Sequence, residues 1–196
     1  MNVPNRITIC RIILSIILLI MLIFPLEKIG IIFPEIMVKE NFIIDSKYLI
    51  SGVIFMIASL TDFLDGHLAR KYNMVTDIGK VMDAIADKLL VNGVLIILAF
   101  EGYISVIIPV IIVSRDIIVD SIKMVAGAKN GAVGASKTGK AKTAFMMVGL
   151  TLLFFYDLPL SIFNIYPAKV LILIATVLSI ISGVQYYEKN KKYLLK

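Results

Sequence analysis

The stretch DFLDGHLARKYNMVTDIGKVMDAIAD, residues 62–87, decides the fold and the chemistry of this chain. It joins two apolar segments, and the first ends with Asp62 and Asp65 while the second begins with Asp83 and Asp87. At about 100° per residue, these spacings place each pair on one face of a helix. An antiparallel helical hairpin would then hold all four carboxylates at a similar depth, about 12 Å from the connection at 1.5 Å per residue.

The whole chain is too apolar for a soluble protein of its size. Of its 196 residues 59% are hydrophobic, the mean hydropathy is +0.94, and several apolar runs are long enough to cross a bilayer. We therefore expect residues 1–196 to form a single all-α integral membrane domain. A short interfacial helix at the N-terminus should precede six transmembrane helices, with residues 27–47 as a loop on the far side. The expected spans cover about residues 7–26, 48–69, 81–100, 103–125, 141–158 and 168–187.

Positive charge is distributed unevenly along the chain, whose net charge is +6. If both termini are cytoplasmic, the outer segments contain only four of the 20 Lys and Arg residues, namely Lys28, Lys39, Lys47 and Lys169. An excess of Lys and Arg in cytoplasmic loops is typical of membrane proteins. The distribution therefore predicts cytoplasmic termini and a cytoplasmic face for the four aspartates. The positive charge is expected to serve anionic ligands rather than nucleic acid.

Four carboxylates within apolar helices require a balancing charge. An Asp at the centre of a membrane helix costs about 2.5 to 3.5 kcal/mol on insertion scales, and less at a shallow depth. Two divalent cations would neutralise four carboxylates, and ligands that are all oxygen favour Mg²⁺, Mn²⁺ or Ca²⁺ over zinc. The alternative is a group of acids that faces a water-filled vestibule without metal. The residues predicted to form the metal site are Asp62, Asp65, Asp83 and Asp87.

The pattern D-x-x-D-G-x-x-A-R-x8-G-x3-D-x3-D resembles the signature of the CDP-alcohol phosphatidyltransferases, and all eight fixed positions occur in residues 62–87. The resemblance implies that the aspartates hold two divalent cations, Mg²⁺ or Mn²⁺, which bind the pyrophosphate of a CDP-alcohol. It implies that Asp87 activates the acceptor hydroxyl, and that the protein is a homodimer. The motif positions implied to lie against the CDP-linked substrate are Gly66, Ala69, Arg70 and Gly79.

The N-terminal stretch PNRITICR, residues 4–11, carries polar side chains at helical spacing. Asn5 and Thr8 are three residues apart and therefore near one another on a helix, with Arg11 on the same side. The stretch is similar to a P-N-x-x-T-x-x-R element in family members that use glycerophosphate. That similarity implies that Asn5 and Thr8 contact the CDP-linked substrate. An amphipathic membrane anchor is the alternative.

Two basic elements follow the aspartates. Arg115 interrupts the fourth apolar run, and because Asp116 should point about 100° away, the guanidinium is expected to reach into a shared cavity. The alternative is a structural ion pair between helices. The stretch ASKTGKAKT, residues 135–143, places hydroxyls and ammonium groups near a predicted helix N-terminus, which suits a phosphate, although basic runs also contact lipid headgroups.

Arg115 together with this stretch is similar to the phosphate pocket of the phosphatidylglycerophosphate synthases within the family. This similarity implies transfer of a phosphatidyl group from CDP-diacylglycerol to glycerol 3-phosphate, with release of CMP, in a bacterial inner membrane. Another acceptor alcohol, such as inositol phosphate, serine or phosphatidylglycerol, remains open. So do a divalent-cation transporter and a purely structural membrane protein. The residues expected to hold the glycerol phosphate are Arg115, Ser136, Lys137, Lys140, Lys142 and Thr143.

Overall fold

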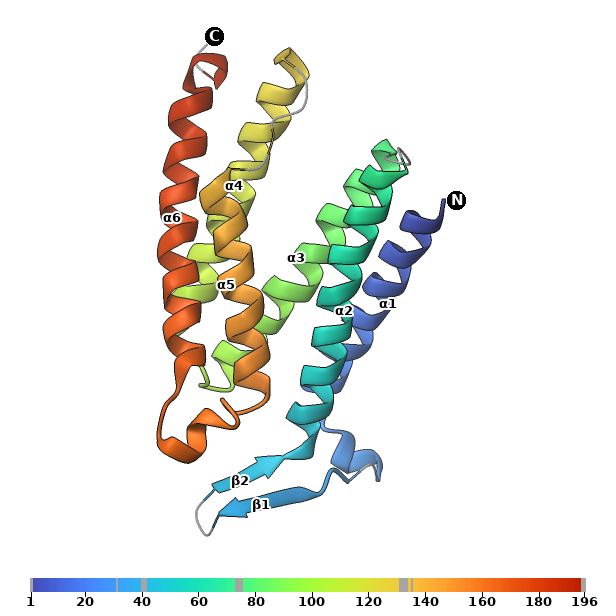
Figure 1. The fold of residues 1–196 in the computed structure, drawn as a ribbon, viewed down its shortest axis with the longest axis vertical. Helices are drawn as coiled ribbons and strands as arrows, with labels where there is room; N and C mark the ends of the chain where they lie inside the picture. The colour runs from blue at the N-terminus through green and yellow to red at the C-terminus, as the bar shows by residue number, and fades with distance from the viewer. Residues whose placement is uncertain are drawn as a thin grey trace.

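The computed structural model describes residues 2–30, 32–39, 42–72, 76–130, 134 and 136–194. The described chain is mostly helical, as predicted (Figure 1). Two short 3₁₀ helices, η1 and η2, and a two-stranded antiparallel hairpin, β1 with β2, complete it. In chain order the elements are α1 (Val3–Ile23), η1 (Leu26–Ile29), β1 (Glu35–Lys39), β2 (Phe42–Asp45), α2 (Ser46–Lys71), α3 (Asp77–Phe100), α4 (Ile107–Asn130), α5 (Lys137–Phe154), η2 (Leu160–Phe163) and α6 (Pro167–Leu194).

The long helices form two neighbouring groups. Helix α1 packs against α2 and α3, while α6 packs against α4 and α5, and contacts between α2 and α5 and between α3 and α4 join the groups. In Figure 1 both termini and the α2–α3 connection lie at one end of the molecule, and the β hairpin lies at the other. The aspartates near the α2–α3 connection therefore lie toward the end that carries both termini.

An apolar core joins the two groups of helices. Leu18 of α1, Leu95 of α3 and Ile172 of α6 are buried in it. Phe55 of α2 packs against Phe154 of α5, with ring centroids 5.6 Å apart. Many large apolar side chains on the outer helix faces are exposed, which suits contact with lipid tails.

Within the described residues, three helices are long and apolar enough to cross a membrane, by length and composition alone. They span Pro4–Ile23, Ser46–Gly66 and Pro167–Lys192. Helices α3, α4 and α5 are not among them, because each carries at least three charged side chains along its length. Six membrane crossings therefore remain a prediction.

The N-terminal interfacial helix does not exist as a separate element, so this part of the prediction is wrong. Residues 3–23 form the single helix α1, with Pro4 in its first turn. Proline is tolerated there because the first N–H groups of a helix have no intrahelical acceptor. No proline or glycine follows until Pro25, so the helix continues without interruption into the apolar run.

The expected far-side loop contains regular structure that was not predicted from the sequence. Residues 26–29 form η1, and β1 pairs with β2 so that Ile36 lies opposite Ile44 and Glu35 opposite Asp45. Isoleucine favours strands, and both strands contain it. The connection after α2 is also shorter than expected, because α3 already begins at Asp77; residues 73–75 lie outside the described chain.

Candidate active site

Three of the four predicted metal ligands converge between α2 and α3. One carboxylate oxygen each of Asp62, Asp65 and Asp83 lies within 4.8 Å of the other two. Asp65 is buried, Asp62 is half-buried and Asp83 is exposed, so the group has an open side. Converging carboxylate oxygens are the donor set that a hard divalent cation prefers. The arrangement therefore fits the predicted metal site.

Asp87 lies apart from this group, one helical turn beyond Asp83 on α3. Together with Asp62 and Asp83, it lines a cavity of about 430 Å³. One turn of α-helix advances about 5.4 Å, so Asp87 faces the same cavity at a greater distance from the α2–α3 connection. This position separates Asp87 from the three converging carboxylates, whereas the sequence pattern predicts all four acids in one metal site.

Arg11 is a site residue that was not predicted from the sequence. Its side chain is fully buried on α1, and its guanidinium forms ion pairs with Asp62, with Asp65 at 3.7 Å and with Asp83. One cation thus contacts the three carboxylates that would bind metal. The helical spacing of Asn5, Thr8 and Arg11 was the signal that could have identified it.

Thr8 and Asn5 hold parts of the site in position. The Thr8 hydroxyl donates a hydrogen bond to Asp65 Oδ2 at 2.9 Å and is buried. The Asn5 amide donates to Thr76 Oγ1 at 3.2 Å, and Thr76 caps the N-terminus of α3. These contacts tie α1 to both aspartate-bearing helices.

The motif positions Gly66, Ala69 and Arg70 all lie on α2, toward its C-terminal end. Gly66 directly follows the buried Asp65, so it is next to the carboxylate group. The side chains of Ala69 and Arg70 lie outside the described part of the structure. Their predicted contacts with a CDP-linked substrate stay predictions.

Gly79 allows α1 to approach the N-terminus of α3, which gives a stability prediction. A Cβ at this position would lie 2.7 Å from Asn5 Oδ1 and 2.9 Å from Thr76 Oγ1. Replacing Gly79 by Ala should therefore lower the free energy of unfolding by about 1 to 3 kcal/mol, as overpacking usually does. Thermal unfolding of the purified protein in detergent would measure this loss.

Gly127→Ala is the matched control for Gly79→Ala. Gly127 is also helical, but a Cβ there would meet no atom within 4 Å, and alanine favours helix over glycine. The control should therefore be neutral or slightly stabilising. Equal stability of the Gly79→Ala protein and the unmodified protein would show that Asn5 can move away without cost.

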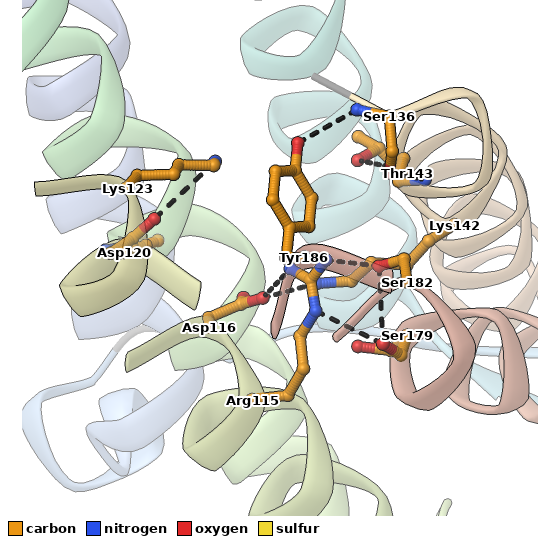
Figure 2. A network of polar contacts seen from close by, with 12 residues as sticks. Arg115, Asp116, Asp120, Lys123, Ser136, Lys142, Thr143, Ser179, Ser182 and Tyr186 are labelled. Atoms are coloured by element: carbon orange, nitrogen blue, oxygen red, sulfur yellow. Dashed lines mark hydrogen bonds and ion pairs between the residues drawn. The ribbon is translucent and has the colours of Figure 1, made fainter. Parts of the chain in front are cut away.

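Basic residues from α4 and α5 form the opposite wall of the cavity. The Arg115 Nη1 donates to Asp116 Oδ1 at 2.9 Å, and Lys142 Nζ donates to the same oxygen at 2.7 Å (Figure 2). The helical angle had predicted that the Asp116 side chain points away from Arg115. The two side chains meet instead, because the long arginine side chain bends back to Asp116. All three residues line the cavity, together with Lys140 and Thr143.

Ser136 and Lys137 lie differently from the other predicted phosphate-binding residues. The Ser136 hydroxyl accepts a hydrogen bond from the Gly139 N–H at 3.0 Å and caps α5, which therefore starts earlier than expected. Lys137 is exposed and is not among the residues that line the cavity. The structure thus brings Arg115, Lys140, Lys142 and Thr143 to the cavity, and uses Ser136 to fix the helix that carries three of them.

The cavity wall includes charged and aromatic residues that were not predicted as site residues. Lys88 of α3 forms an ion pair with Asp120 of α4. Tyr186 comes from α6, where the sequence shows only the end of an apolar run, and nothing in that run indicates which face meets α4. The lining residues that were not predicted are Ala84, Lys88, Asp116, Asp120, Lys123, Gly139 and Tyr186.

The cavity therefore has an acidic wall from α2 and α3 and a more basic wall from α4 and α5. Such a pair of walls suits two anionic groups that must meet. One group would bind through cations held on the acidic wall, and the other would bind directly to arginine and lysine side chains.

Comparison with known proteins agrees with this geometry. The family model for CDP-alcohol phosphatidyltransferase matches residues 1–181. Three relatives carry the name CDP-diacylglycerol--glycerol-3-phosphate 3-phosphatidyltransferase. The protein of Bacillus subtilis (strain 168) is 33% identical over 96% of this chain and 95% of its own length. The protein of Rickettsia typhi (strain ATCC VR-144 / Wilmington) is 33% identical over 98% of this chain and 98% of its own length. The protein of Rickettsia bellii (strain RML369-C) is 35% identical over 74% of this chain and 81% of its own length. The chain therefore belongs to the CDP-alcohol phosphatidyltransferase family of enzymes.

Proposed function

We propose that this enzyme transfers the phosphatidyl group of CDP-diacylglycerol to glycerol 3-phosphate, giving phosphatidylglycerol phosphate and CMP. The observation that carries the proposal is the single cavity that joins Asp62, Asp83 and Asp87 to Arg115 and Lys142. The acidic wall suits the pyrophosphate end of the first substrate, and the basic wall suits the phosphate of the second. The shared name of the relatives supports the choice of substrates.

Two divalent cations, Mg²⁺ or Mn²⁺, are proposed to bind at the acidic wall. The converging oxygens of Asp62, Asp65 and Asp83 fit such ions, and Asp87 is proposed as the fourth ligand. When bound, divalent cations neutralise charge on the pyrophosphate and on the leaving CMP. Thr8 fixes the buried Asp65 through its hydrogen bond at 2.9 Å, so one ligand is oriented before any ion arrives.

The basic wall is proposed to orient the acceptor. Arg115 and Lys142 would bind the phosphate of glycerol 3-phosphate, with Lys140 and Thr143 nearby, so that the free 1-hydroxyl faces α3. Asp87 would accept the proton of that hydroxyl as its oxygen attacks the phosphorus attached to diacylglycerol. The bond from this phosphorus to the CMP oxygen breaks, and CMP leaves with the electron pair.

The chain is further proposed to cross the membrane six times in a homodimer, with both termini and the cavity on the cytoplasmic side of a bacterial inner membrane. Support for the even number of crossings comes from the position of both termini at one end of the helices (Figure 1). Support for the orientation comes from the Lys and Arg distribution.

CMP release by the purified protein in detergent tests the proposed function. With CDP-diacylglycerol and Mg²⁺ or Mn²⁺, release should require glycerol 3-phosphate, because the basic wall is proposed to bind its phosphate and the relatives are named for this acceptor. A chelator should abolish release, and added Mg²⁺ or Mn²⁺ should restore it.

Parallel reactions with inositol phosphate, serine, phosphatidylglycerol and no acceptor serve as controls. Preference for another acceptor would overturn the assignment of the basic wall. Full activity in chelator would contradict the metal site. Absence of release with any acceptor, together with metal flux into vesicles that contain the protein, would favour a cation transporter instead.

A further inference from the structure

Tyr186 of α6 is 5% exposed and lies between the N-terminus of α5 and Arg115 (Figure 2). Its hydroxyl accepts a hydrogen bond from the Ser136 N–H at 2.8 Å and donates one to the Gly134 carbonyl oxygen at 3.0 Å. Both partners belong to the connection that precedes α5. The tyrosine hydroxyl thus fixes the start of the helix that carries Lys140, Lys142 and Thr143.

The ring of Tyr186 holds two cations at one end of the cavity. Arg115 Cζ lies 5.9 Å from the ring centroid, and Lys123 Nζ lies 5.3 Å from it. Both separations are within the range in which a cation is attracted to an aromatic face. Tyr186, Arg115 and Lys123 all line the cavity of the proposed active site.

Helix α6 supports Arg115 at further points. Arg115 Nε donates to the Ser179 carbonyl oxygen at 3.2 Å, and its Nη2 donates to the Ser182 hydroxyl. Gly183 makes room for the arginine side chain, since a Cβ there would lie 3.1 Å from Arg115 Cγ. Helix α6 therefore fixes the position of the Arg115 guanidinium. Tyr186 is the residue of α6 that also contacts the connection leading into α5.

An aromatic ring attracts cations without adding a negative charge. Asp116 accepts hydrogen bonds from Arg115 and Lys142, and Asp120 Oδ1 lies 3.7 Å from Lys123 Nζ. Each of these carboxylates competes with an incoming phosphate for the same cations. The ring of Tyr186 provides attraction that does not neutralise its partners. It can therefore position two cations and leave their charge available for an anion.

We propose that Tyr186 is a positioning residue for the acceptor phosphate, and that Lys123 is a further phosphate-binding residue beside Arg115. This inference rests on the proposed function, because it assumes an acceptor that carries a phosphate. The ring keeps Arg115 and Lys123 at one end of the cavity, and the hydroxyl keeps the first turn of α5 at the same end. Sequence similarity did not identify either residue.

Replacing Tyr186 by Leu removes the aromatic face and the hydroxyl together. The KM for glycerol 3-phosphate should rise about tenfold, as expected for the loss of two cation–π contacts, while the KM for CDP-diacylglycerol stays within about twofold. Tyr186→Phe keeps the ring, so its KM for glycerol 3-phosphate should rise no more than about threefold. Tyr187→Leu is the matched control, because Tyr187 is the next residue of α6 and is 49% exposed.

A merely structural role for Tyr186 would give a different pattern. Equal rises in both KM values, or Phe and Leu variants that are equally impaired, would overturn the inference. If Tyr186→Leu fails to fold, Lys123→Gln provides the test, since Lys123 is partly exposed and its replacement should disturb folding little. This substitution should raise the KM for glycerol 3-phosphate about threefold. An unchanged KM in that variant would overturn the role of Lys123. Absence of CMP release with glycerol 3-phosphate from the unmodified protein would overturn the proposed function and this inference together.

Discussion

Replacing Asp83 by Asn should reduce CMP release from CDP-diacylglycerol by about 1000-fold or more, while the protein stays folded. The substitution preserves the shape of the side chain but removes one of three converging negative charges. An amide supplies one neutral oxygen in place of a carboxylate, so cation binding and charge neutralisation at the leaving group both weaken. A loss of about 1000-fold corresponds to roughly 4 kcal/mol of transition-state stabilisation. Initial rates of CMP release at saturating acceptor and Mg²⁺ or Mn²⁺ measure the effect.

Asp83 is the best member of the acidic group for this test. Its side chain is 54% exposed, whereas Asp65 is buried, so the substitution at Asp83 should disturb folding least. Glu188→Gln removes a carboxylate from an exposed position of α6, away from the cavity lining, and should leave the rate unchanged. Activity of Asp83→Asn close to that of the control would show that the acidic group is dispensable, as a purely structural membrane protein would require.

The acidic wall was predictable from the sequence because its geometry is local. Two aspartates three residues apart and two four residues apart must each share a helix face. The short connection between the helices then brings Asp62, Asp65 and Asp83 together. The pattern did not fix how far Asp87 lies from the other three, since that distance depends on how α2 and α3 cross.

The basic wall was predictable in composition but less so in arrangement. Arg115 was conspicuous as a charge within an apolar run, yet its bond to Asp116 depends on how a flexible side chain bends. Tyr186 contacts Arg115, Lys123 and the connection before α5 only because α6 packs against both α4 and α5. Such contacts between distant segments leave no periodic signal in the sequence.

Replacing Arg11 by Met should lower the thermal stability of the protein strongly in chelator and much less with divalent cations. The buried guanidinium contacts Asp62, Asp65 and Asp83, and methionine leaves these three carboxylates without that positive charge. Removing one partner of a buried ion pair typically costs about 3 to 5 kcal/mol, and we expect the lower end of this range because Asp62 and Asp83 are partly exposed to solvent. For a protein of this size that corresponds to a decrease of about 10 °C in Tm. Circular dichroism of the protein in detergent can follow unfolding, which is convenient because the chain has no Trp.

Added Mg²⁺ or Mn²⁺ should recover at least half of this loss, because a divalent cation on the same carboxylate oxygens replaces the missing charge. Arg6→Met is the matched control, since Arg6 lies on the same helix but is exposed, and its Tm should depend on cations as that of the unmodified protein does. A Tm of Arg11→Met that falls equally with and without cations would mean that the ions do not bind at these aspartates. The same experiment therefore locates the metal site without relying on activity, and it would do so even if the acceptor assignment proved wrong.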